Sequence, residues 1–173
     1  MKRSIAVLAS SRRQGNTGKL IDWIADELQM EVVDLGSKDI SPFDYEHKNI
    51  GDDFLPTLKH ILEFDKLIFA SPVYWYSMSA QMKRFVDRFS DVLAIEELKD
   101  TGRQFRGKAG HIVSISASAK ADDSFLNSFK STFTYLGLNI GSSIHNKCAG
   151  GFREEEYQED VAKFVRELRN PIF

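Results

Sequence analysis

Two hydrophobic patterns alternate along this chain: short unbroken apolar runs, and stretches in which apolar residues recur every three or four positions. Short apolar runs are typical of strands buried on both faces, and the wider spacing is typical of amphipathic helices. Strands are predicted over residues 5–9, 31–35, 66–70, 111–116 and, from a weaker pattern, 139–143. Helices are predicted over residues 16–28, 54–62, 82–89, 125–136 and 157–168. The polar stretch 36–51 and the charged stretch 96–108 are predicted to be connecting loops.

Five strands that alternate with helices predict an α/β fold with a doubly wound parallel sheet, helices on both faces and strand order 2-1-3-4-5. With neither repeats nor a linker segment, a single domain over residues 1–173 is expected. In such sheets ligands bind beyond the carboxyl ends of the strands, where the strand order reverses. For this order the reversal lies between the first and third strands. The two most unusual loops of the sequence follow these same two strands.

Bulk composition narrows the class of protein. A formal net charge of −2 gives no electrostatic reason to expect nucleic acid or an anionic membrane as partner. The sequence has no apolar run of about 18 residues that would predict a spanning helix. The apolar segment near the start ends at Ala9, too early for a secretory signal, so a cytoplasmic protein is expected. The single cysteine, Cys148, excludes an internal disulfide and any cysteine-ligated metal cluster within one chain.

The loop after the first strand, Ser10–Lys19, contains the groups needed to hold a phosphate. It offers hydroxyls, an amide, glycine and backbone N–H groups at a helix start, and Arg12 or Arg13 adds a positive charge. A plainer alternative is that Asn16 or Thr17 caps the helix and the rest is a solvated turn. The spacing of its glycines fits neither a Walker A loop nor a dinucleotide-binding loop. Its position after the first buried strand favours the phosphate.

The loop after the third strand places three aromatic rings in succession, Tyr74, Trp75 and Tyr76. Strand or helix geometry would force some of these rings into water, so a core does not account for them. Rings placed where a strand gives way to a helix suit a flat conjugated ligand. The alternative is an aromatic patch at a subunit contact, and the two interpretations are compatible.

Together these loops resemble those of the NAD(P)H-dependent FMN reductases, which have the flavodoxin-like fold. Residues 10–17, Ser-Ser-Arg-Arg-Gln-Gly-Asn-Thr, match the family pattern Ser-x-Arg-x-x-(Gly/Ser)-Asn-Thr, and residues 71–88 look like the flavin loop with its following helix. The resemblance implies that FMN is the cofactor. Its phosphate would be held by Ser10, Arg12, Gly15, Asn16 and Thr17. The ring system would be enclosed by Pro72, Val73, Tyr74, Trp75 and Tyr76, with backbone N–H groups from Val73 to Trp75 at its polar edge.

A third loop, Ser116–Asp122, follows the fourth strand, and by the same resemblance Ser116 and Ser118 would contact the flavin edge. Many members of the family have paired glycines here, whereas this chain has small residues and no glycine. The alternative is a simple turn in which Asp122 or Asp123 caps the next helix.

The resemblance implies an enzyme that takes hydride from NAD(P)H onto flavin N5 and passes electrons to a small acceptor, such as a quinone, flavin, azo or nitro compound. No catalytic side chain is required, and the four scattered histidines predict no metal site. A homodimer is expected, with neither nucleic acid nor membrane as partner. The choice between NADH and NADPH is open. Two alternatives are a flavodoxin-like electron carrier that serves a protein partner, and an interaction module that has lost FMN.

Overall fold

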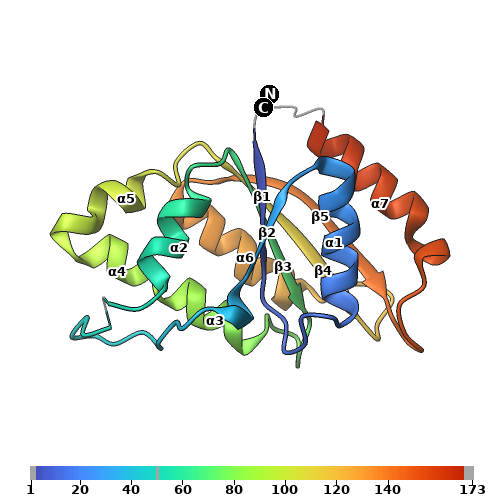
Figure 1. Ribbon diagram of the computed structural model, residues 1–173, viewed down its shortest axis with the longest axis horizontal. Helices are drawn as coiled ribbons and strands as arrows, with labels where there is room; N and C mark the ends of the chain where they lie inside the picture. Colours follow the sequence, from blue (N-terminus) through green and yellow to red (C-terminus); the bar gives the residue numbers. More distant parts are fainter. Residues whose placement is uncertain (1–2, 50, 170–173) are drawn as a thin grey trace.

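A computed structural model describes residues 3–49 and 51–169 of the chain, and its centre is a twisted parallel sheet (Figure 1). The strands are β1 (Ser4–Leu8), β2 (Glu31–Asp34), β3 (Lys66–Pro72), β4 (Ala109–Ser116) and β5 (Asn139–Lys147). They are paired in the order β2-β1-β3-β4-β5, and every pairing is parallel. The predicted doubly wound α/β fold and strand order are therefore confirmed. Residues 1, 2, 50 and 170–173 of the predicted domain lie outside the described residues.

Helices cover both faces of the sheet (Figure 1). On one face lie α1 (Asn16–Leu28) and α7 (Glu154–Arg169). On the other lie α2 (Phe54–Ile61), α3 (Ala80–Asp87), α4 (Phe89–Ala94), α5 (Lys99–Arg103) and α6 (Asp123–Leu136). Two 3-10 helices, η1 (Leu35–Ser37) and η2 (Glu96–Leu98), complete the described elements.

The central strand β3 shows why its sequence is almost entirely apolar. Successive side chains of a strand point to opposite faces, so Leu67 and Phe69 pack under α2 and α6 while Ile68 and Ala70 pack under α1 and α7. All four side chains are fully buried. A strand buried on both faces must be apolar at every position, which is the pattern that predicted it.

The structure corrects the prediction of a loop over residues 96–108, because η2 and α5 lie within it. Their exposed faces are charged, with Lys99 paired to Glu96 and Arg103 paired to Asp100. Only α5 has buried residues, Thr101 and Gly102, and a Cβ on Gly102 would lie 2.6 Å from the Val92 carbonyl oxygen. These helices lack the regular apolar spacing by which sequence analysis recognises a helix.

Other element boundaries also differ from their predictions. The single helix expected over residues 82–89 is divided at Arg88 into α3 and α4. Strand β3 extends to Pro72 and β5 to Lys147, each beyond its predicted end. The loops that follow β1, β3 and β4 gather at one end of the sheet, opposite the chain termini (Figure 1).

Candidate functional site

The first loop leaves the start of α1 open. The N-cap residue is Gly15, and no side chain bonds to the helix end, so the alternative in which Asn16 or Thr17 caps the helix is wrong. Lys19 is the first residue of the helix whose N–H has an acceptor, the Gly15 carbonyl at 3.0 Å. Within the described residues the backbone N–H groups of Asn16, Thr17 and Gly18 have none. Such groups, together with the positive end of the helix dipole, favour an anion at this point.

Gly18 allows the loop to fold closely onto the helix. A Cβ at this position would lie 1.8 Å from the Arg13 carbonyl oxygen, whereas at Gly15 it would lie 3.0 Å from the Arg12 carbonyl oxygen. Gly15 has an ordinary backbone φ of −76°. Sequence analysis proposed Gly15 as a site residue, but Gly18 is under the tighter steric constraint. Spacing alone could not distinguish them.

The two arginines of the loop have different environments. Arg13 forms a bidentate ion pair with Asp22 on α1, at 2.7 and 2.8 Å, and its Nε lies 3.9 Å from Asp34. The pairing with Asp22 raises the pKa of Arg13. Arg12 is exposed and makes no side-chain ion pair or hydrogen bond within residues 3–49 and 51–169. Of the two, Arg12 is thus the one available to an anionic ligand.

Ser10 and Thr17 line the loop from its buried side. Ser10 is 8% exposed and its Oγ accepts a long hydrogen bond of 3.5 Å from the Arg12 N–H. Thr17 is buried in the first turn of α1. The residues proposed for the phosphate are therefore grouped around the open helix end.

The second loop is a tight turn with two aromatic residues at its tip. Tyr74 and Ser77 exchange N–H···O hydrogen bonds of 3.0 Å in both directions, and between them Trp75 and Tyr76 have φ values of +48° and +65°. Positive φ at both central residues is the pattern of a type I′ turn, which favours Gly, Asn or Asp. Bulky residues there store strain of about 1–3 kcal/mol each. Trp75 is 92% exposed and Tyr76 65%, as expected for rings that a core cannot accommodate.

Two of the three N–H groups expected to reach a ligand are bonded within the protein, one to β4 and one inside the turn. The Val73 N–H donates to the Ile115 carbonyl oxygen at 3.2 Å, because the pairing of β3 with β4 continues past Pro72. The Tyr74 N–H is bonded within the turn. The expectation that N–H groups from Val73 to Trp75 are all available is wrong. Trp75 and its neighbour Tyr76 retain N–H groups without an acceptor in the described part of the chain.

Two buried serines hold the first and second loops together. Ser79, the N-cap of α3, accepts the Met82 N–H at 3.2 Å and donates its own hydroxyl to the Ala9 carbonyl oxygen at 2.8 Å. Its backbone N–H donates to Ser71 Oγ at 2.9 Å. Both serines are fully buried. The ends of β1 and β3 and the start of α3 are therefore fixed to one another, a role that sequence analysis missed because it depends on long-range contacts.

The third loop is organised by His145 on β5. Its Nε2 lies 3.2 Å from both the Ser118 carbonyl oxygen and Ser116 Oγ, and its Nδ1 lies 2.8 Å from Ser114 Oγ. The Ser116 hydroxyl also accepts the Ser118 N–H at 3.1 Å. Burial lowers the pKa of His145 below its usual value. At the end of the loop the Asp122 carboxylate accepts the Ser124 N–H at 2.8 Å, so of the two cap candidates in the alternative interpretation Asp122 is the one that caps α6.

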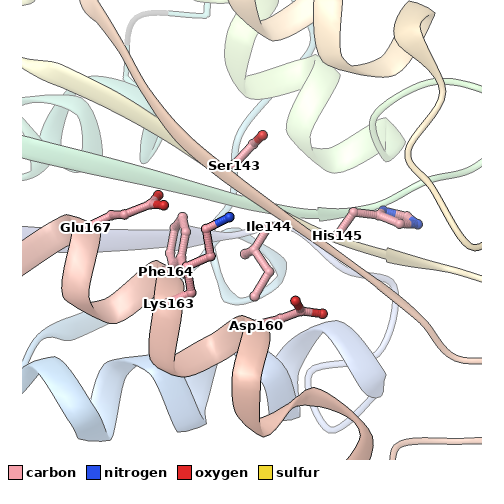
Figure 2. A pocket seen from close by; sticks show the side chains of 7 residues that line it. All are labelled: Ser143, Ile144, His145, Asp160, Lys163, Phe164 and Glu167. Atoms are coloured by element: carbon pink, nitrogen blue, oxygen red, sulfur yellow. The ribbon is translucent and has the colours of Figure 1, made fainter.

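Figure 2 shows the side chains around a small pocket between β5 and α7. Ile144 points toward α7, whereas His145 projects away from that helix (Figure 2). The described residues contain no group of three or more His, Cys, Asp or Glu side chains suited to a metal ion. Among the described helices, none has the length and apolar character needed to cross a membrane.

The five-stranded parallel sheet, its strand order and the helices on both faces define a protein of the flavodoxin-like class. The open end of α1 lies where the strand order reverses, at the same end of the sheet as the loop that carries the exposed aromatic rings (Figure 1). The chain belongs to the NADPH-dependent FMN reductase family, whose model matches residues 3–147. FMN, the cofactor implied by the sequence, is the one for which the family is named.

Individual relatives agree with this membership. YwqN of Bacillus subtilis (strain 168), a proposed NAD(P)H-dependent FMN-containing oxidoreductase, is 28% identical over 145 residues, covering 79% of this chain and 80% of the relative. The structure of the Trp repressor binding protein from Bacillus subtilis superposes with a TM-score of 0.73 at 19% identity, covering 95% and 98% of the two chains. An FMN-dependent NADH-azoreductase from Bacillus anthracis in complex with FMN gives 0.68 at 12% identity, covering 97% of each chain. These structural likenesses concern the fold.

Proposed function

We propose that this protein binds FMN and uses it to transfer electrons from NAD(P)H to a small acceptor. The proposal rests on the start of α1, where the backbone N–H groups have no acceptor and Arg12 is exposed nearby. The aromatic turn lies at the same end of the sheet (Figure 1). A phosphate needs donors and positive charge, and a flavin ring needs a flat apolar surface. The chain supplies both at neighbouring strand ends.

The phosphate of FMN fits the first loop. The N–H groups of Asn16, Thr17 and Gly18 supply donors, and the Arg12 guanidinium supplies the charge. Ser10 and Thr17 add hydroxyls from the buried side. Arg13 is held by Asp22 and supports the shape of the loop.

The ring system fits between the second and third loops. Tyr74, Trp75 and Tyr76 provide aromatic surface, while the N–H groups of Trp75 and Tyr76 can donate to the polar ring edge. Pro72 and Val73 form the base of this loop, and Ser116 and Ser118 belong to the loop on its other side. The buried Ser71–Ser79 contact holds the turn against the phosphate loop.

When bound, FMN supplies the redox chemistry, accepting hydride equivalents from NAD(P)H and passing electrons on. The residues of this chain bind and orient the ring, and fixed N–H donors at its edge favour the reduced, more negative form. No side-chain acid or base is needed for this role. The acceptor is a small molecule of the quinone, flavin, azo or nitro class.

Homodimerisation and a cytoplasmic location belong to the same proposal. Trp75, Tyr76 and Tyr74 expose apolar surface at one tip, which a second copy would cover in part. Size-exclusion chromatography with light scattering measures the assembly directly.

The deciding experiment is an absorbance spectrum of the purified protein, followed by anaerobic addition of NADPH and NADH. A flavin band near ~450 nm that bleaches within seconds supports the reductase, and the two rates rank the nicotinamides. A yellow protein that bleaches only slowly would indicate an electron carrier. A colourless protein that takes up no added FMN would overturn the proposal.

A further inference from the structure

The third loop contains no glycine, and its shape is imposed by a histidine from the neighbouring strand. His145 bonds to three serines, Ser114 and Ser116 on β4 and Ser118 in the loop. The edge strand also holds the loop through the backbone, where the Cys148 N–H donates to the Ser116 carbonyl oxygen at 2.7 Å. These contacts fix the first residues of the loop against β5.

The partners of His145 determine which ring nitrogen carries the proton. The Ser118 carbonyl oxygen can only accept, so Nε2 must be the donor at 3.2 Å. Nδ1 of the neutral ring is then an acceptor, and the Ser114 hydroxyl donates to it at 2.8 Å, in preference to the Ile144 carbonyl oxygen at 3.3 Å. The ring is thus held from both ends, and its Nε2 donor is shared between the Ser118 carbonyl oxygen and the Ser116 hydroxyl, each at 3.2 Å.

Fixing that carbonyl group also fixes the next amide. The peptide bond between Ser118 and Ala119 is trans, because the described chain contains no cis bond. In a trans peptide the C=O and N–H groups point in opposite directions. Since the Ser118 carbonyl points to His145 on β5, the Ala119 N–H points away from His145. This N–H has no acceptor among the described residues, and Ala119 is exposed.

We propose that His145 is a positioning residue that directs the Ala119 N–H at the edge of the bound flavin ring. The inference rests on the proposed FMN site and adds to it a donor from the third loop. His145 itself touches no ligand. It acts by holding the Ser118–Ala119 peptide in one orientation. Without this contact, a loop of small residues would not keep the peptide in that orientation.

The test compares FMN with riboflavin, which has the same ring and lacks the phosphate. In titrations of the apoprotein followed by flavin fluorescence, His145→Leu should raise the Kd of both ligands by the same factor, about threefold to tenfold for one lost hydrogen bond. His145→Gln should stay within about twofold of the parent, because its amide can donate to Ser118 and accept from Ser114. His60→Leu is the matched control, since His60 lies on the surface of α2 beside Glu31. It should change neither Kd.

A second readout reports the amide itself. In ¹⁵N-labelled protein, the Ala119 amide resonance should shift on addition of FMN in the parent and in His145→Gln, and should respond weakly in His145→Leu. If His145→Leu does not fold, Ala119→Pro removes the N–H with His145 intact and should cause the same loss. A folded His145→Leu or Ala119→Pro variant that binds both ligands with the parental Kd would overturn the inference. A His145→Gln variant whose Kd values are raised as much as those of His145→Leu would also overturn it. If the parent binds neither FMN nor riboflavin, the proposed function fails first.

Discussion

At the scale of single residues, two adjacent arginines have separate tasks. Arg13 is held in a bidentate pair with Asp22, whereas Arg12 is exposed beside the open end of α1. The residues of the loop allowed either arginine as the charge, and the family resemblance implied Arg12. The choice between them depends on Asp22, nine positions further along the chain, and on the fold that brings it back.

Replacing Arg12 by Ala should therefore weaken FMN binding at least about tenfold, the typical effect of losing a charge-assisted hydrogen bond. Riboflavin affinity and the free energy of unfolding should not change, because Arg12 contacts neither the ring site nor the core. Fluorescence titration and urea unfolding measure the two quantities. Arg13→Ala is the comparison variant, and its main expected effect is on stability. Equal losses of FMN and riboflavin affinity in Arg12→Ala would contradict the phosphate role.

Gly18 gives a steric prediction at the same scale. Its added Cβ would overlap the Arg13 carbonyl oxygen, so Gly18→Ala should displace the loop from the helix end and reduce FMN affinity by more than about tenfold. Gly51→Ala is a suitable control, since a Cβ there meets nothing within 4 Å. Isothermal titration of both variants provides the measurement. A Gly18→Ala variant with parental affinity would show that the loop is not needed in this form.

At the scale of elements, the aromatic turn shows what hydrophobic patterning can and cannot predict. The rings of Tyr74, Trp75 and Tyr76 were expected outside the core, and all three are exposed to different degrees. The positive φ angles were not predictable, because aromatic residues rarely adopt them and a local pattern therefore argues against such a turn. A different reason explains η2 and α5: η2 buries no residue and α5 buries only Thr101 and Gly102, so neither carries a periodic apolar signal.

The strain in this turn can be tested by a residue that tolerates it. Tyr76→Asn should raise the free energy of unfolding by about 1 kcal/mol, because asparagine adopts positive φ more readily than tyrosine. It should also weaken ring binding, since it removes aromatic surface. Tyr135→Asn is the control: Tyr135 is similarly exposed but lies within α6. If thermal unfolding shows no difference between the two variants, the turn stores no strain that a substitution can release.

At the scale of the whole molecule, strand order followed from the sequence because a parallel α/β chain has few ways to close its core. Runs buried on both faces identified the strands, and the two unusual loops marked the reversal point. What the sequence did not supply is the set of contacts between elements: Ser79 to Ala9, and His145 to the third loop. Each joins residues far apart in the chain, so no local spacing predicts it.

At the junction of β4, β5 and α7 lies a buried histidine, His111, from which we expect the stability of the molecule to depend on pH. His111 on β4 is 6% exposed, accepts the Ser142 N–H at 3.0 Å, and packs edge-on against Phe164 at 6.2 Å between ring centres. Among the described residues its Nε2 has no hydrogen-bond partner. Burial, with the nearby positive charge of Lys66, lowers the pKa of His111 from 6.5 to about 4. The folded protein thus keeps this imidazole neutral where the unfolded chain would take up a proton.

Because the unfolded chain binds more protons between pH 6.5 and 4, the stability associated with His111 is fully present above pH 6.5 and falls as the pH drops to 4. A shift of this size corresponds to about 3 kcal/mol. Urea unfolding at pH 7, 5.5 and 4.5 should show this decline, and His111→Gln should show a shallower one, since its amide can accept the Ser142 N–H without titrating. His60→Gln, at an exposed position, should retain the parental slope. If the parent and His111→Gln lose stability equally on acidification, other groups must dominate the acid response, and the buried histidine does not set it.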